Sequence, residues 1–109
     1  MKRLDPASVA RDARGAEGRP ATAMVHDSAD ARLVVFRLAA GQEVPPHTSA
    51  STVLLTVLAG TGTLSGADAE HVCRTGDVVA YEPGELHGMR ATDGELLLLA
   101  TITPRPGGR

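Results

Sequence analysis

Aromatic residues are almost missing from this chain of 109 residues, which has one Tyr, one Phe and no Trp. Aliphatic and small side chains must therefore form the core, because 42% of the residues are still hydrophobic. Cysteine is equally scarce: Cys73 is the only one, so no intrachain disulfide can form, and a reducing compartment is expected. The length suits a single domain.

Excess charge and long apolar runs are lacking as well. The formal net charge is −2 and the arginines are scattered, whereas nucleic-acid binding needs a concentrated positive surface. No apolar run approaches the roughly 18 residues that a membrane span requires. Basic residues open the chain, but no apolar segment follows them, so we expect no secretory signal. We therefore predict a cytoplasmic protein that binds neither nucleic acid nor membrane.

The two ends of the chain offer little to bury. Residues 1–20 are polar, and we predict a flexible or weakly ordered N-terminal segment. The alternative is a short helix over Pro6–Arg14, because Asp5 can cap it and Pro6 suits the first helical position. Residues 105–109 are expected to form a C-terminal tail.

From residue 21 onward, short β-rich runs alternate with turn signals about every ten residues, a pattern typical of an all-β barrel or sandwich. Pairs such as Pro83-Gly84 and Asp93-Gly94 indicate turns. No run keeps the 3.6-residue period of a helix. The predicted strands are Ala21–His26, Arg32–Leu38, Thr52–Leu58, Gly62–Ser65, His71–Arg74, Val78–Tyr81, Gly88–Ala91 and Glu95–Thr103.

Two of these runs indicate what lies on each face of the sheet. In Thr52–Leu58, the side chains of Val53, Leu55 and Val57 share a wholly apolar face, which should point into the barrel. The run Leu96–Leu99 is apolar on both faces, so something should cover its outer face. The cover is either the N-terminal segment or a second subunit. We favour the second subunit and therefore expect a homodimer.

Two stretches of the chain carry glycines and histidines in an order that resembles the cupin superfamily. In the first stretch, Gly41, His47 and Gly60 stand where the family has a Gly, its first His and a closing Gly. In the second stretch, Gly76 and His87 match, together with the Gly that follows Pro83. The resemblance implies a cupin-type double-stranded β-helix, or jelly-roll, barrel over residues 21–104, with His47 and His87 inside it.

The resemblance also implies a metal site, which looks incomplete in this chain. Typical cupins hold a divalent metal with two His and a Glu from the first motif and one His from the second. Here Ser49 replaces the second His and Val53 replaces the Glu. Only His47 and His87 remain as metal-ligand candidates, for a weakly bound Fe, Mn, Ni, Cu or Zn ion; otherwise no cofactor is expected.

The predicted ligand pocket combines apolar walls with a few polar groups, which is the usual design of a small-molecule site. Ser and Val in place of His and Glu make it less charged, so we predict that it binds a small organic molecule. The alternative is a metal-dependent cupin enzyme (a dioxygenase, isomerase or lyase) acting on a small molecule. The predicted lining is His47, Ser49, Val53, Leu55, Val57, Tyr81, His87 and Met89.

The remaining chemically active side chains have simpler interpretations. His47 and His87 fit equally well as neutral histidines that bond a ligand or each other. His26 and His71 are expected on strand surfaces, and Cys73 is expected to act as a small buried hydrophobe. A third hypothesis is an empty barrel with a structural or regulatory role. The sequence assigns no catalytic residue; in a metal-free enzyme, His47 or His87 would act as general base or acid.

Overall fold

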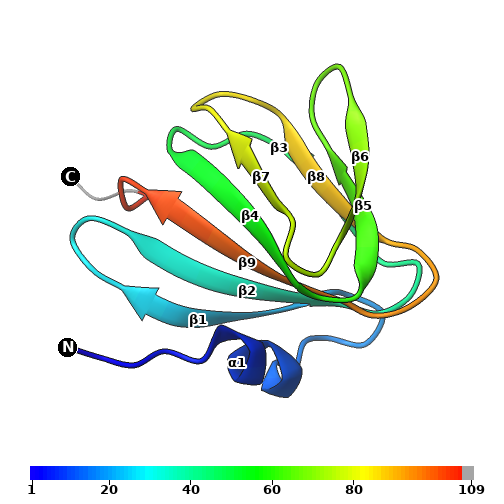
Figure 1. The fold of residues 1–109 in the computed structure, drawn as a ribbon, viewed down its shortest axis with the longest axis horizontal. Coiled ribbons are helices and arrows are strands. Elements are labelled where there is room, and N and C mark those ends of the chain that lie inside the picture. Colours follow the sequence, from blue (N-terminus) through cyan, green and yellow to red (C-terminus); the bar gives the residue numbers. More distant parts are fainter. Residues whose placement is uncertain (107–109) are drawn as a thin grey trace.

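Two antiparallel sheets form the body of the protein (Figure 1). The structure is a computed structural model that describes residues 1–106. One sheet has five strands in the order β1-β2-β9-β4-β7, and the other has four in the order β3-β8-β5-β6. No helix in this part of the chain is long and apolar enough to cross a membrane. The elements are α1 (Pro6–Asp12), β1 (Ala21–Asp27), β2 (Arg32–Leu38), β3 (Glu43–His47), β4 (Thr52–Ala59), β5 (Thr61–Ser65), β6 (Glu70–Arg74), β7 (Val78–Tyr81), β8 (His87–Ala91) and β9 (Leu96–Thr103).

The strand pattern agrees with the sequence prediction except at β3. Each of the eight predicted runs is a strand with bounds within one residue of those expected. Glu43–His47 is a further strand that the pattern of the sequence does not predict, because Pro45 and Pro46 lack the N–H donors of a ladder. The two prolines fit because β3 is an edge strand and its pairing with β8 is irregular between Val44 and His47. An edge strand tolerates residues that cannot donate to the ladder.

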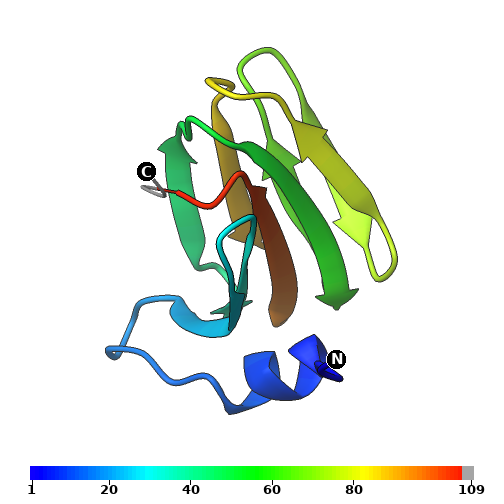
Figure 2. The ribbon, with the colours of Figure 1, turned by 90° about the vertical axis from the view of Figure 1, so that its left-hand side faces the viewer.

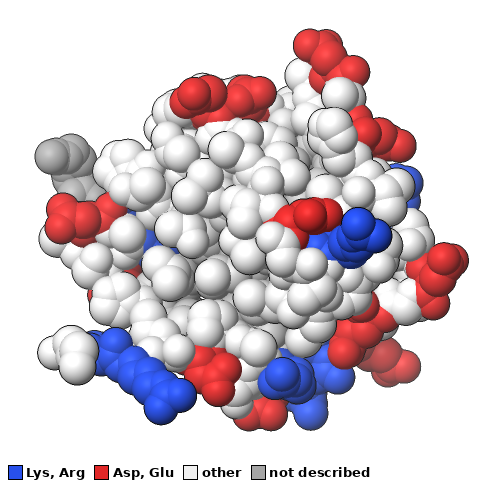
Figure 3. All heavy atoms as spheres, viewed as in Figure 1, with Lys and Arg blue, Asp and Glu red and all other residues white. Residues whose placement is uncertain are grey.

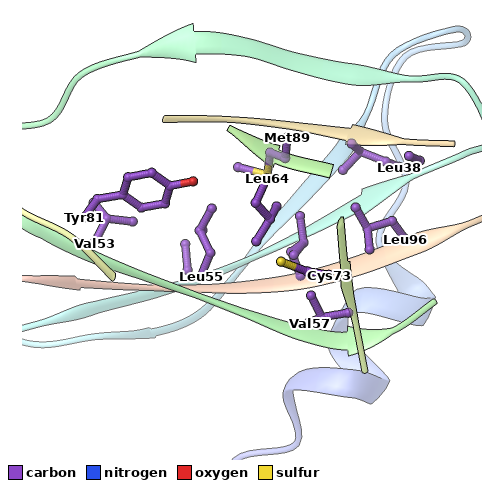
Figure 4. Packing of buried hydrophobic residues seen from close by; sticks show 12 residues of the cluster. Leu38, Val53, Leu55, Val57, Leu64, Cys73, Tyr81, Met89 and Leu96 are labelled. Atoms are coloured by element: carbon purple, nitrogen blue, oxygen red, sulfur yellow. The ribbon is translucent and has the colours of Figure 1, made fainter. Parts of the chain in front are cut away.

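The core lies between the two sheets, which stack face to face (Figure 2). Val53, Leu55 and Val57 are each at most 3% exposed and point inward, as the alternation along β4 predicts. Leu96 and Leu98 of β9 are fully buried beside them. Figure 4 shows these aliphatic side chains packed with sulfur-containing ones rather than with aromatic rings, apart from one tyrosine.

The N-terminal segment is more ordered than predicted, because Pro6–Asp12 forms a helix. Its start matches the alternative hypothesis: Asp5 is the N-cap, and its carboxylate accepts a hydrogen bond from the Ser8 backbone N–H at 3.2 Å. A helix this short depends on tertiary packing for its stability. That packing comes from Ala10, which is completely buried against the sheet. The expectation of a weakly ordered segment is therefore corrected for these residues.

Helix α1 also explains the strand that is apolar on both faces. Leu97, on the outer face of β9, is only 2% exposed because it packs with Ala10 and Val35. The N-terminal segment is thus the cover at this position, and not a second subunit as we favoured. Leu97 by itself no longer argues for a homodimer.

The C-terminal end is fastened to β1 by an ion pair. Arg105 Nε lies 2.7 Å from Asp27 Oδ1, and Arg32 Nε lies 3.4 Å from the same oxygen. Hydrogen bonds from Arg105 and then Arg32 lower the pKa of Asp27 to about 2. The first residue of the predicted 105–109 tail is therefore held in place, whereas residues 107–109 lie outside the described part of the chain.

Candidate functional site

Two histidines meet at the junction of β3 and β8. His47 ends β3, His87 begins β8, and the two residues are paired across the sheet. Their ring centroids are 4.1 Å apart, and the ring planes are inclined by 59°. The structure therefore brings together the two imidazoles that the sequence places 40 positions apart.

A glycine allows the two strands to approach closely at this point. Gly88 is buried next to His87, and a Cβ atom on it would lie 2.9 Å from Ser65 Oγ. The same atom would lie 3.2 Å from both the Pro46 nitrogen and the Val44 carbonyl oxygen of β3. The missing side chain leaves room for the backbone of β3 beside β8, which seats His47 against His87.

Backbone carbonyls define the protonation of both rings. His47 Nδ1 lies 3.1 Å from the Pro45 carbonyl oxygen, and His87 Nδ1 lies 3.3 Å from that of Glu85. A carbonyl oxygen only accepts hydrogen bonds, so each Nδ1 carries the proton and donates it. In a neutral imidazole, Nε2 then keeps its lone pair as an acceptor.

The environment of His87 keeps its ring neutral. The residue is only 4% exposed, and burial lowers the pKa of its imidazole below the ordinary value of 6.5. The hydrogen bond to the Glu85 carbonyl acts in the opposite direction, and the neighbouring His47 lowers the pKa further. Every fully buried side-chain nitrogen and oxygen of residues 1–106 has a partner. Nε2 of His87 has no hydrogen-bond partner among these residues, so it is not one of the fully buried atoms.

The histidine pair borders a cavity of about 250 Å³ between the two sheets. Its walls are mostly apolar, and its polar groups come from residues 47–49 and His87. Such a distribution is typical of small-molecule sites. The lining residues are Phe36, His47, Thr48, Ser49, Val53, Leu55, His87, Met89, Ala100 and Ile102.

Two of the predicted pocket residues do not line this cavity. Val57 lies farther along β4, where it packs near Cys73 and Leu96 in the core (Figure 4). Tyr81 instead supports the site: its ring centroid is 5.1 Å from that of His87, and its hydroxyl donates to the Ser65 carbonyl at 3.0 Å. The other six predicted residues all face the cavity.

Four lining residues were not predicted from the sequence. Ala100 and Ile102 of β9 are the cross-strand partners of Leu55 and Val53. Phe36 comes from β2, the next strand across the sheet, and Thr48 follows His47 directly. The inward alternation along β9 offered a signal, but its pairing with β4 could not be read from the sequence.

The residues at the site fall short of the metal centre that cupins usually have. Within residues 1–106, no three His, Cys, Asp or Glu side chains lie close enough together to hold a metal ion. His47 and His87 offer two nitrogens, whereas such centres commonly use three or four protein ligands. The positions at which the resemblance expects a His and a Glu hold Ser49 and Val53.

The two-sheet fold is that of the cupin superfamily. The profile of the cupin domain family matches residues 34–102, and the chain belongs to this family. No curated protein matches it.

Among solved structures, an RmlC-like cupin protein from Desulfovibrio desulfuricans is 30% identical, with a TM-score of 0.81 over 95% of this chain and 97% of that one. TT1209 from Thermus thermophilus is 25% identical, with a TM-score of 0.85 over 97% and 100%. The DMSP lyase DddQ from Ruegeria pomeroyi is 21% identical, with a TM-score of 0.74 over 86% of this chain and 53% of that one. At this identity the likeness to the lyase concerns the fold alone.

Proposed function

We propose that the barrel cavity binds a small organic molecule that is mostly apolar and donates a hydrogen bond to the histidine pair. The observation that carries this proposal is the fixed tautomer of both rings: each Nδ1 is engaged by a carbonyl, which leaves Nε2 as an acceptor. The cavity of about 250 Å³ lies just below the roughly 300–1,000 Å³ of usual ligand pockets. The ligand is correspondingly small.

The electrostatics of the site favour a neutral or cationic ligand over an anion. His87 is neutral, and Arg and Lys are absent from the cavity lining. An anion would therefore meet the Nε2 lone pair of His87, and no Arg or Lys of residues 1–106 lines the cavity to compensate its charge. A hydroxyl or ammonium group can donate to this nitrogen, while the ligand body packs against Val53, Leu55 and Met89.

Three ligands of matched shape test this proposal: cyclohexanol, cyclohexylamine and cyclohexanecarboxylate. We expect the alcohol and the amine to shift the methyl NMR signals of Leu55 and Met89 saturably at pH 7.5, and the carboxylate to have little effect. The substitution His87→Ala removes one hydrogen bond to the ligand, so it should weaken binding of the alcohol and the amine about five- to tenfold. His71→Ala is the control, because His71 is exposed on β6 and does not line this cavity. Tighter binding of the carboxylate would contradict the proposal.

The second candidate function is a metal-dependent enzyme (a dioxygenase, isomerase or lyase). It is favoured by one observation: an imidazole whose Nδ1–H is anchored to a carbonyl presents Nε2 in the manner of many metal-ligating histidines. A weak divalent transition metal at His47 and His87 would supply Lewis-acid chemistry. Metal analysis of protein purified without chelator decides: near-stoichiometric metal that is lost in both His47→Ala and His87→Ala supports the enzyme.

We also propose that the chain forms a homodimer through the outer face of the five-stranded sheet. Beyond α1, Leu33, Leu54 and Leu99 are only partly buried there, and Val78 is 57% exposed. Figure 3 shows the middle of this face without charged side chains. These apolar residues come from four neighbouring strands and lie on one uncharged surface, which suits burial against a second copy.

Light scattering after size-exclusion chromatography tests the dimer. The wild-type chain should have about twice its mass of 11.3 kDa, and Val78→Glu should shift it to the monomer. Val72→Glu is the matched control, because Val72 is 77% exposed on β6 of the other sheet. A wild-type monomer, or an equal effect of both variants, would contradict this interface.

A further inference from the structure

A second cavity, of about 350 Å³, lies outside the barrel where residues 13–19 pass over β1 and β2. It shares no lining residue with the cavity at the histidines. Three arginines and one carboxylate line it: Arg14, Arg19, Arg37 and Glu95. The charges at this site therefore sum to about +2, although the whole chain has a net charge of −2.

Arg37 belongs to the framework of this cavity. Its Nε donates to Glu95 Oε2 at 2.7 Å, and its Nη1 donates to the carbonyl oxygen of Arg11. These bonds tie β2 both to the turn before β9 and to the end of α1. Glu95 thereby neutralises Arg37, and the remaining positive charge comes from Arg14 and Arg19.

Arg14 and Arg19 keep donors available on the cavity wall. Arg14 uses only Nη1, which donates to the carbonyls of Arg11 and Ala13 at 3.0 and 2.9 Å. The guanidinium of Arg19 makes no hydrogen bond within residues 1–106. Between them, Gly15 lies so close to β1 that a Cβ would sit 3.1 Å from both the Ala21 Cα and the Pro20 carbonyl oxygen. The tight path of the segment places both arginines on the wall of this cavity.

We propose that this cavity binds a small oxyanion, such as the carboxylate or phosphate group of a metabolite. A planar guanidinium presents paired N–H donors that match the oxygens of such groups. Arg14 and Arg19 are exposed and have no carboxylate within ion-pair distance among residues 1–106, so an anion can approach their charges without a competing group. The site is independent of the barrel cavity, which has no Arg or Lys of residues 1–106 in its lining and for which we propose a ligand that donates a hydrogen bond.

Titration with inorganic phosphate and, separately, with acetate tests the site by ¹⁵N–¹H NMR. We expect saturable shifts of the amides of Arg14, Gly15 and Arg19, which weaken as NaCl is added. The stronger response to one anion identifies the class of ligand group. Shifts that do not saturate, or that occur equally over the whole surface, would overturn the proposal.

Charge-neutral variants make the test specific. Arg14→Gln combined with Arg19→Gln should weaken anion binding at least about tenfold, a loss of about 1.4 kcal/mol. The control is Arg74→Gln, because Arg74 is exposed on β6 in the other sheet. Arg37 is left unchanged because it fastens α1 to β2. Retained binding in the double variant, or equal loss in the control, would overturn the proposal even if the barrel ligand is confirmed.

Discussion

Two glycines in left-handed conformations, Gly60 and Gly76, differ in the space that is available for a Cβ atom. Gly60 has φ +88° and Gly76 has φ +96°, and both are exposed. A Cβ on Gly60 would overlap the Glu95 carbonyl oxygen, which is backbone and cannot move aside cheaply. A Cβ on Gly76 would meet no atom within 4 Å. Alanine at the two positions therefore has the same conformational cost but a different steric cost.

The difference between the two costs follows from these contacts. Forcing an L-residue into a left-handed conformation costs roughly 1–2 kcal/mol, which is the whole expected effect of Gly76→Ala. Gly60→Ala carries this cost together with the overlap on Glu95, and overpacking adds roughly 1–3 kcal/mol. We therefore expect Gly60→Ala to be the less stable variant by about that second amount.

Urea unfolding followed by circular dichroism measures this difference. With a slope of about 1–3 kcal/mol per molar urea for a small domain, the two midpoints should differ by roughly 1 M. Gly94→Ala is the control, because a Cβ on Gly94 meets no atom within 4 Å and its φ is not left-handed; it should be nearly neutral. Equal midpoints for Gly60→Ala and Gly76→Ala would refute the argument from crowding.

Three further predictions concern titration and the seating of the histidines. Burial lowers the pKa of His87 below 6.5, so at pH values below 6.5 the unfolded chain binds more protons than the folded one. The free energy of unfolding should therefore fall as the pH drops from 6.5. His87→Gln should flatten the curve of melting temperature against pH. Because arginines lower the pKa of Asp27 to about 2 from 3.8, its contribution to stability should vanish as the pH falls from 3.8 to 2, and Asp27→Asn should show less loss over that range in acid unfolding. Gly88→Ala should push β3 away from β8 and weaken the nuclear Overhauser effects between the rings of His47 and His87. The far-ultraviolet circular dichroism of the variant should stay close to that of the wild type, which would exclude unfolding as the cause.

The sequence predicted those parts of the fold that depend on local patterns. Alternation placed Val53 and Leu55 inside, and the turn signals separated the strands within a residue of their ends. Both features depend on the backbone preferences of single residues and on the period of a strand, which can be read without a partner. The convergence of His47 and His87 is instead what the resemblance to the cupin motifs implied.

The features that were missed all depend on distant parts of the chain. Pro45 and Pro46 are compatible with a strand only because β3 lies at a sheet edge, which is a property of the topology. Ala10 stabilises α1 only because Val35 and Leu97 lie beneath it. Likewise, Ile102 enters the cavity through its register with β4, which no local pattern defines.

The cavity takes its walls from both sheets: Val53 and Ile102 come from one, and His87 and Met89 come from the other. A molecule bound there contacts both sheets, so it binds the folded protein and not the unfolded chain. At a hundredfold excess over its Kd, such a ligand adds about 2.7 kcal/mol to the free energy of unfolding. A rise in the melting temperature of the unmodified protein can therefore identify ligands in a compound library. The measurement needs neither a dye bound in the cavity nor a known reaction.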